Sequence, residues 1–355
     1  MVKKFSGSNK SAVALACLLA SWGAQAQSNV TIYGILDAGV TIVDDAGGSS
    51  RKLVDTGVMQ GSRFGFRGSE DLGGGLRANF LLEQGILLDT GTLGQGGLAW
   101  GRQAWVGLSS DQFGSVLVGR QYDLMYDALI SFHTPTVSAG GYANNVVDND
   151  RLSGQRLNNS VKYRSPKMAG LTFSVMGAAP EGAANGAGKA GSAGVLYASG
   201  PLTLGAGYTY VRGATVDIRS LVTSATPVVM GGSFSRTLGA GGSYVLGQTT
   251  LHGLYSQAEF GGPTSGKFRN YEAGVAHRLG SWNLGLAYAH TKLSENKYDQ
   301  LDLTADYFLS KRTDVYAQVI GQKASGAGAR AAIFLLPGSS TDEQAAFRLG
   351  LRHAF

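Results

Sequence analysis

Residues that could act as nucleophiles or metal ligands are few in this sequence and are not grouped. The five histidines are scattered, the single cysteine is Cys17, and no G-x-S-x-G or P-loop element occurs. Disulfide frameworks, thiolate metal sites and cysteine nucleophiles are therefore not expected. His133 has no second histidine beside it, so we expect a solvated or packed side chain. The sequence predicts no metal, no cofactor and no catalytic residues.

Charged side chains recur instead at every second position of short alternating segments. Arg63 and Arg67 alternate with Phe64 and Phe66, and the side chains of a strand point alternately to its two faces. A charged side chain that faces water along a passage attracts ions of opposite sign and sets which solutes pass. The same parity places Asp37, Arg77, Glu83, Arg156 and Lys162 on the polar faces of their segments, and Leu157, Val161 and Tyr163 on the opposite face.

Composition favours a large antiparallel β protein. Glycine accounts for 54 of 355 residues and proline for only 7, alongside 15 tyrosines and 14 phenylalanines. Collagen would need a strict glycine period of three, and a disordered chain would have fewer aromatic residues.

The first 26 residues have the features of a cleaved secretory signal. Lys3, Lys4 and Lys10 precede the apolar stretch 12–20, and an A-x-A site ends at Ala26, so we expect the mature chain to begin at Gln27. This apolar stretch is too short for a spanning helix, which needs about 20 residues. Loss of three lysines lowers the formal charge from +6 to +3 (6 − 3). That charge, without a basic run, does not indicate nucleic-acid binding.

Alternation of apolar and polar residues predicts sixteen strands after the signal. Most have the length of about 9–11 residues that a tilted strand needs to cross a bilayer. The predicted strands are 29–43, 62–71, 75–87, 100–109, 114–121, 156–165, 171–179, 190–199, 202–213, 234–246, 248–259, 269–279, 282–292, 297–309, 312–324 and 343–355.

The connectors between these strands alternate strictly between short and long. Seven short and eight long connectors are what sixteen strands need when both termini lie at the short-turn end. Short periplasmic turns and longer extracellular loops are typical of a transmembrane β-barrel. Closure of the sheet satisfies every backbone group in hydrocarbon. We therefore predict an all-β fold, a 16-stranded antiparallel barrel over 27–355, in contact with outer-membrane lipid.

Several segments resemble the Gram-negative general diffusion porins, in particular their β-proteobacterial branch. The resemblance covers nearly the whole mature chain in order, which makes it more specific than any one motif. It is carried by Val30–Gly34, Ser62–Leu76, Gly119–Tyr122, Tyr126–Leu129, Asn159–Pro166 and Gly350–Phe355.

This resemblance implies a homotrimeric outer-membrane pore for small hydrophilic solutes and ions. It also implies that the third long loop, 122–155, folds into the lumen as a constriction loop. From the residues themselves we expect a short helix at its start, over 122–130. Phe355 resembles the signal that hands such proteins to the outer-membrane barrel assembly machinery. Four arginines match arginines of the family: Arg63, Arg102, Arg120 and Arg156. Of these four, Arg63, Arg102 and Arg156 match the basic wall of the family's pore.

The candidate site is thus a set of charges around the lumen. The loop stretch 131–145 contains no acid, whereas cation-preferring relatives carry acids there, so we predict a weak anion preference. The basic wall is predicted to comprise Arg63, Arg67, Arg102, Arg120, Arg156 and Lys162. The predicted pore-lining and loop acids are Asp37, Glu83, Asp123, Asp127, Asp148 and Asp150.

Three alternatives remain open at this point. A substrate-selective porin could bind small organic anions at the arginine wall. An outer-membrane barrel enzyme would need a Ser/His or Asp/His set at the rim, and the sequence shows no convincing one. An exported β-sandwich adhesin would usually have strands nearer 5–6 residues, and it would be released without detergent.

Overall fold

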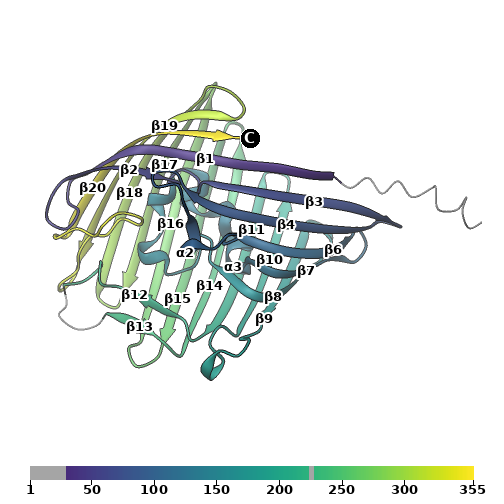
Figure 1. The fold of residues 1–355 in the computed structure, drawn as a ribbon. Coiled ribbons are helices and arrows are strands. Elements are labelled where there is room, and N and C mark those ends of the chain that lie inside the picture. The colour runs from purple at the N-terminus through teal and green to yellow at the C-terminus, as the bar shows by residue number, and fades with distance from the viewer. Residues whose placement is uncertain (1–28, 224–227) are drawn as a thin grey trace, which may run out of the picture.

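A computed structural model describes residues 29–223 and 228–355 of the chain, and the predicted signal peptide at 1–26 lies outside this part. Sixteen long strands form one closed sheet (Figure 1). In the described part of the chain, no helix has both the length and the apolar character needed to cross a membrane. The barrel strands are β1 (Asn29–Val43), β3 (Arg63–Gly73), β4 (Leu76–Leu87), β6 (Gln103–Ser110), β7 (Gly114–Tyr122), β8 (Arg156–Arg164), β9 (Leu171–Ala178), β10 (Ala190–Ser199), β11 (Leu202–Arg212), β14 (Phe234–Leu246), β15 (Thr249–Gly261), β16 (Gly266–Leu279), β17 (Trp282–Leu293), β18 (Asn296–Phe308), β19 (Thr313–Ser325) and β20 (Glu343–Ala354).

The barrel closes through its first strand. Residues Asn29–Ile35 of β1 pair with β3, and residues Ile35–Val43 pair with β20, both antiparallel. Every other barrel strand pairs with its neighbours in chain order, so the sheet has no free edge. The predicted 16-stranded antiparallel barrel is confirmed, and each predicted strand overlaps the observed one.

Short elements in the long loops were not predicted. β2 (Arg51–Thr56) continues along β1 beyond the end of β3. β5 (Thr92–Leu93) pairs with β4 and precedes the turn α2 (Gly94–Gly97). The remaining elements are the hairpin of β12 (Thr215–Asp217) and β13 (Val229–Gly231), and the 3₁₀ turn η4 (Ala184–Gly186).

The two faces of the barrel have inverted polarity relative to a protein in water. Outward-facing Ile32 and Val106 are about three-fifths exposed, whereas inward-facing Gln300, Asp302 and Gln318 are buried. An apolar exterior band is stable against hydrocarbon and would be unfavourable in water. The barrel wall is therefore built to lie in a bilayer around a polar interior.

The long segment between β7 and β8 packs against the inner face of the barrel. Its helix α3 (Leu124–Leu129) contacts β10, β11 and β14, and its helix α4 (Thr134–Val137) contacts β15, β16 and β17. The predicted helix at 122–130 thus corresponds to α3, which is shorter. Three 3₁₀ turns complete the segment: η1 (Ile130–Phe132), η2 (Gly141–Ala143) and η3 (Val146–Asp148).

Apolar side chains from other long loops fill part of the barrel mouth. Ile218 and Leu221 are buried against Phe260 and Phe268, which point inward from β15 and β16. Ile333, from the loop between β19 and β20, packs against Tyr142 of the inner segment. The sequence did not predict this packing of loop residues inside the barrel mouth.

Gly285 of β17 should be sensitive to substitution because Ser138 lies directly above it. A Cβ atom at this position would overlap the Ser138 carbonyl oxygen. We expect G285A to displace the inner segment and to increase its cleavage by added protease at least severalfold. G321A is the matched control, since nothing lies within 4 Å of its added Cβ. Equal cleavage of the two variants would contradict this packing.

Candidate functional site

A cavity in the lumen lies between the barrel wall and the inner segment. On the wall side it is lined by Arg63 of β3, by Arg102 just before β6 and by Arg156 at the start of β8. Opposite them lie residues 135–139 of the inner segment, which carry no charge. The cavity is therefore strongly basic on the wall side, and residues 135–139 add no charge opposite it.

The three arginines are held by shared partners. Arg102 Nε donates to Glu83 Oε1 over 2.8 Å, and its Nη2 donates to the Tyr122 hydroxyl over 2.8 Å. Arg156 Nη2 donates to the same hydroxyl over 2.9 Å and stacks over the Tyr122 ring at 4.5 Å from its centroid. Arg63 Nη1 lies 4.0 Å from Glu83 Oε2. One carboxylate thus faces two guanidinium groups, and Arg156 has only the Tyr122 hydroxyl and ring as partners, which leaves an excess of positive charge.

A β-bulge decides how β8 presents its side chains. The register of β7 against β8 shifts between Gly119 and Gln121, and Asn159 has a positive φ of 51°. The bulge interrupts the alternation, as an extra residue in one strand does. Leu157 is consequently buried inside with Leu124, although parity placed it on the outer face. Downstream of the bulge, Ser160 and Lys162 are buried and Val161 is exposed, as predicted.

The prediction that Arg120 belongs to the pore wall is wrong. Arg120 pairs in register with Ala104 and therefore shares a face with Val106 and Val118, both at least half exposed on the outer surface. Its Nε donates to the Gly101 carbonyl over 2.9 Å. Its strand alternates weakly in the sequence, so the resemblance alone could not fix the direction of this side chain.

Arg67 and Lys162 lie in the lumen but away from the arginine wall. Both line a second cavity nearer the short-turn end, together with Arg164 and Asp127. Lys162 Nζ is 2.6 Å from Asp127 Oδ2, and the Arg67 guanidinium lies 5.3 Å from the centroid of the Tyr33 ring.

The predicted acids mostly have internal partners. Asp37 accepts from the Tyr316 hydroxyl at 2.6 Å, and Glu83 joins the arginine group. Asp123 caps α3 by accepting from the Tyr126 N–H at 3.1 Å and pairs with Arg151. Asp148 accepts from the Ser153 N–H and the Gln155 side chain, each at 2.8 Å. None of these carboxylates lines the cavity beside the arginine wall.

Two charged lining residues were missing from the predicted site. Arg352 and Asp306 border the same cavity as the arginine wall. Arg352 Nη2 lies 3.4 Å from Asp306 Oδ2, and its Nε lies 3.0 Å from Asp314. Both residues lie on the polar face of their alternating strands, and this position could have identified them as pore-lining from the sequence.

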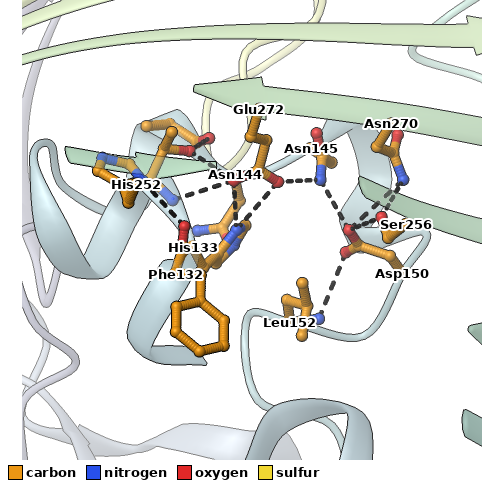
Figure 2. A network of polar contacts seen from close by, with 12 residues as sticks. Phe132, His133, Asn144, Asn145, Asp150, Leu152, His252, Ser256, Asn270 and Glu272 are labelled. Carbon is orange, nitrogen blue, oxygen red and sulfur yellow. Dashed lines mark hydrogen bonds and ion pairs between the residues drawn. The ribbon is translucent and has the colours of Figure 1, made fainter. Parts of the chain in front are cut away.

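A buried polar network fastens the inner segment to the wall (Figure 2). His133 Nδ1 lies 2.8 Å from Glu272 Oε2, and its Nε2 lies 2.8 Å from Asn144 Oδ1. Asn145 donates to both Glu272 and Asp150, at 2.6 Å and 2.7 Å. Asp150 also accepts from Ser256 of β15 at 2.6 Å. His133 is thus a packed residue, one of the two environments predicted for it.

The network should be sensitive to alkaline pH through His133. Burial acts to lower the pKa of His133, but the Glu272 carboxylate opposes it, and the net result is a rise from 6.5 to about 9. The charged imidazole therefore stabilises the fold below pH 6.5, and this contribution is lost as pH rises through about 9.

We expect protease cleavage within 122–155 and open-channel current noise to rise together as pH passes through about 9. H133N removes the titrating group and should abolish the step, leaving a pH-independent response. A step of the same size in H133N would contradict the assignment to His133.

Comparisons with known proteins were made for the whole chain. A family model described as Gram-negative porin matches residues 11–326. Outer membrane porin protein 32 of Delftia acidovorans is 34% identical, over 98% of this chain and 99% of its own. An outer membrane porin protein of Bordetella pertussis is 29% identical, over 98% of this chain and 100% of its own. The solved structure of an anion-selective porin from Comamonas acidovorans has a TM-score of 0.76 and 29% identity, covering 93% of this chain and 100% of that one.

Proposed function

The chain belongs to the Gram-negative porin family, and on that premise we propose that its arginine-lined lumen is a weakly anion-selective channel. The sequence predicted the porin family, the outer-membrane location and a water-filled channel for passive diffusion, and the porin relatives agree with all three. The anion preference, the narrowing role of 122–155, the trimer and the solutes are proposals.

The observation that carries the anion preference is the charge around the main cavity. Four arginines line it (63, 102, 156 and 352), against one lining carboxylate, Asp306. With Glu83 added beside Arg102 and Arg63, and Asp314 beside Arg352, the local balance is +1 (4 − 3). Such a ring of positive charge lowers the energy of a passing anion and raises that of a cation. The anion-selective porin from Comamonas acidovorans supports the same preference.

We propose that segment 122–155 sets the size limit of the channel. Its residues 135–139 stand opposite the arginine wall across the cavity, and the His133–Glu272 network holds it there. Ions and small hydrophilic solutes would pass by diffusion alone, and the protein would not act as an enzyme.

The homotrimer is supported by the outer face of β7 and β8. Arg120 and Asn158 are hydrogen-bonded on the outward side, where a lipid-facing arginine is unfavourable. A neighbouring copy of the chain would cover this pair. Phe355 directly follows β20 and exchanges backbone hydrogen bonds with Gly34 of β1, and we propose that it is the signal read by the barrel assembly machinery.

Liposome swelling tests the proposed function. Vesicles containing the purified protein should swell in both glucose and gluconate, and faster in gluconate, because the two solutes have similar size and differ in charge. Swelling in neither solute would reject the channel, and faster swelling in glucose would reject the anion preference alone.

A further inference from the structure

We propose that the second cavity in the lumen, at the short-turn side of segment 122–155, binds small amphipathic anions. The ligand class is a carboxylate that carries a ring or a branched apolar body. This inference rests on the proposed channel function, because such a solute reaches the cavity only through the lumen. We refer to the site, centred on Arg67, Trp105, Leu117 and Arg164, as the vestibule subsite.

Apolar side chains face the lumen here, against the general polarity of the barrel. Trp105, Leu81 and Leu117 line the cavity and are half-buried. Their strand neighbours Val106 and Val118 are at least half exposed on the outer surface, which confirms that Trp105 and Leu117 point inward. A tryptophan and two leucines give a water-filled passage an apolar surface, whose burial by a ligand is favourable.

Glycines in the neighbouring strands make room for this surface. Trp105 pairs in register with Leu81 on one side and Gly119 on the other. Gly107 pairs with Leu117, and a Cβ atom at 107 would lie 2.5 Å from Leu117 Cδ2. The leucine side chain therefore lies over the glycine. The result is an open apolar shelf that a ring could lie on.

Positive charge borders the shelf. Arg67, Lys162 and Arg164 line the cavity with one acid, Asp127, a balance of +2 (3 − 1). Asp127 forms an ion pair with Lys162, whose Nζ lies 2.6 Å from Asp127 Oδ2. Within 29–223 and 228–355, neither Arg67 nor Arg164 forms an ion pair with an acidic side chain. Two guanidinium groups are thus available to an anion from solution.

The spacing suits one small molecule that meets both surfaces. Arg67 pairs in register with Leu81, and Leu81 with Trp105, so Arg67 and Trp105 lie two strands apart, about 10 Å between backbones. The long arginine side chain bridges part of this span. A carboxylate at Arg67 would place an attached ring near Leu81 and Trp105.

The subsite is distinct from the arginine wall. No residue lines both cavities. The wall arginines 63, 102 and 156 have Glu83 and Tyr122 as partners, and among the described residues no tryptophan lines their cavity. We expect an inorganic anion to be attracted at both places, whereas the Trp105 ring adds affinity for an apolar body in the vestibule subsite alone.

Tryptophan fluorescence tests the proposal without relying on transport. The chain from Gln27 with W100F and W282F retains Trp105 as its one tryptophan. We expect cyclohexanecarboxylate, which does not absorb in the tryptophan range, to change this fluorescence saturably. Acetate and cyclohexylmethanol should bind at least about tenfold more weakly at matched ionic strength, since each lacks one half of the recognised structure.

Variants separate the subsite from the wall. R67Q with R164Q should weaken cyclohexanecarboxylate binding about tenfold, and R63Q should leave it unchanged. Heat-modifiable migration of the barrel serves as the folding control, and the ligand series on the unsubstituted arginines tests the proposal even if a variant does not fold.

Equal responses to acetate and cyclohexanecarboxylate, or no saturation, would overturn the subsite. Potassium chloride conductance is recorded on the same preparation, so the two claims fail separately. Conductance without saturable fluorescence would reject only the subsite. Saturable fluorescence without conductance would reject the channel and also the route by which the ligand is proposed to arrive.

Discussion

Replacing Arg63 and Arg156 together by glutamine is expected to lower the chloride-over-potassium permeability ratio about five- to tenfold. Each arginine attracts the anion and repels the cation by about 0.5 kcal/mol at 8 Å in water. For two arginines the effect on the ratio sums to about 2 kcal/mol, and salt screening reduces it to the stated range. The reversal potential in a potassium chloride gradient measures this ratio directly.

R51Q is the matched control for this double variant. Arg51 is an exposed arginine of β2, in the long-loop region and outside both cavities. R51Q removes the same chemical group and should leave the chloride-over-potassium permeability ratio nearly unchanged. A ratio that falls equally in both variants would show that overall charge, and not the arginine wall, sets the preference.

The second large effect is expected from E272Q, which removes the charged partner of His133. Both side chains are almost fully buried, and breaking a buried ion pair costs about 3–5 kcal/mol. Glu272 also accepts from the Thr134 N–H at 3.0 Å and from Asn145 at 2.6 Å, so the variant disturbs the whole attachment of the inner segment. We expect a larger and noisier single-channel conductance, with protease cleavage within 122–155.

E259Q is the comparison for E272Q. Glu259 lies in the neighbouring strand β15, 3.8 Å from Lys267, and both side chains are at least one-third exposed. An exposed pair of this kind contributes about 0–1 kcal/mol. Channels of E259Q should therefore match the unsubstituted protein. If E272Q channels also match it, the network does not hold the segment in place.

The strands of the barrel could be predicted because one physical rule governs all of them. A strand between lipid and water must alternate, so β1, β10 and β14 were located to the residue. The rule fails where pairing is irregular. Because of the bulge at Asn159, the Leu157 side chain points inward and not outward. Arg102 precedes β6, so the alternation of that strand does not determine where its side chain points.

The attachment of the inner segment could not be predicted from one sequence. His133 and Glu272 are 139 residues apart, and no local pattern links them. The apolar residues Ile218 and Leu221 likewise lie in a loop whose composition gave no sign that it enters the barrel mouth. The resemblance to the family also has a limit. It identified Arg120 as a matching residue, but it did not determine the direction of the Arg120 side chain.

The anion preference of the channel can be measured as the reversal potential of the unsubstituted protein in a planar bilayer, across an approximately tenfold potassium chloride gradient. We expect open channels and a potential displaced towards that of chloride, because the arginine wall faces no acid on the inner segment. A potential displaced towards that of potassium would contradict this preference.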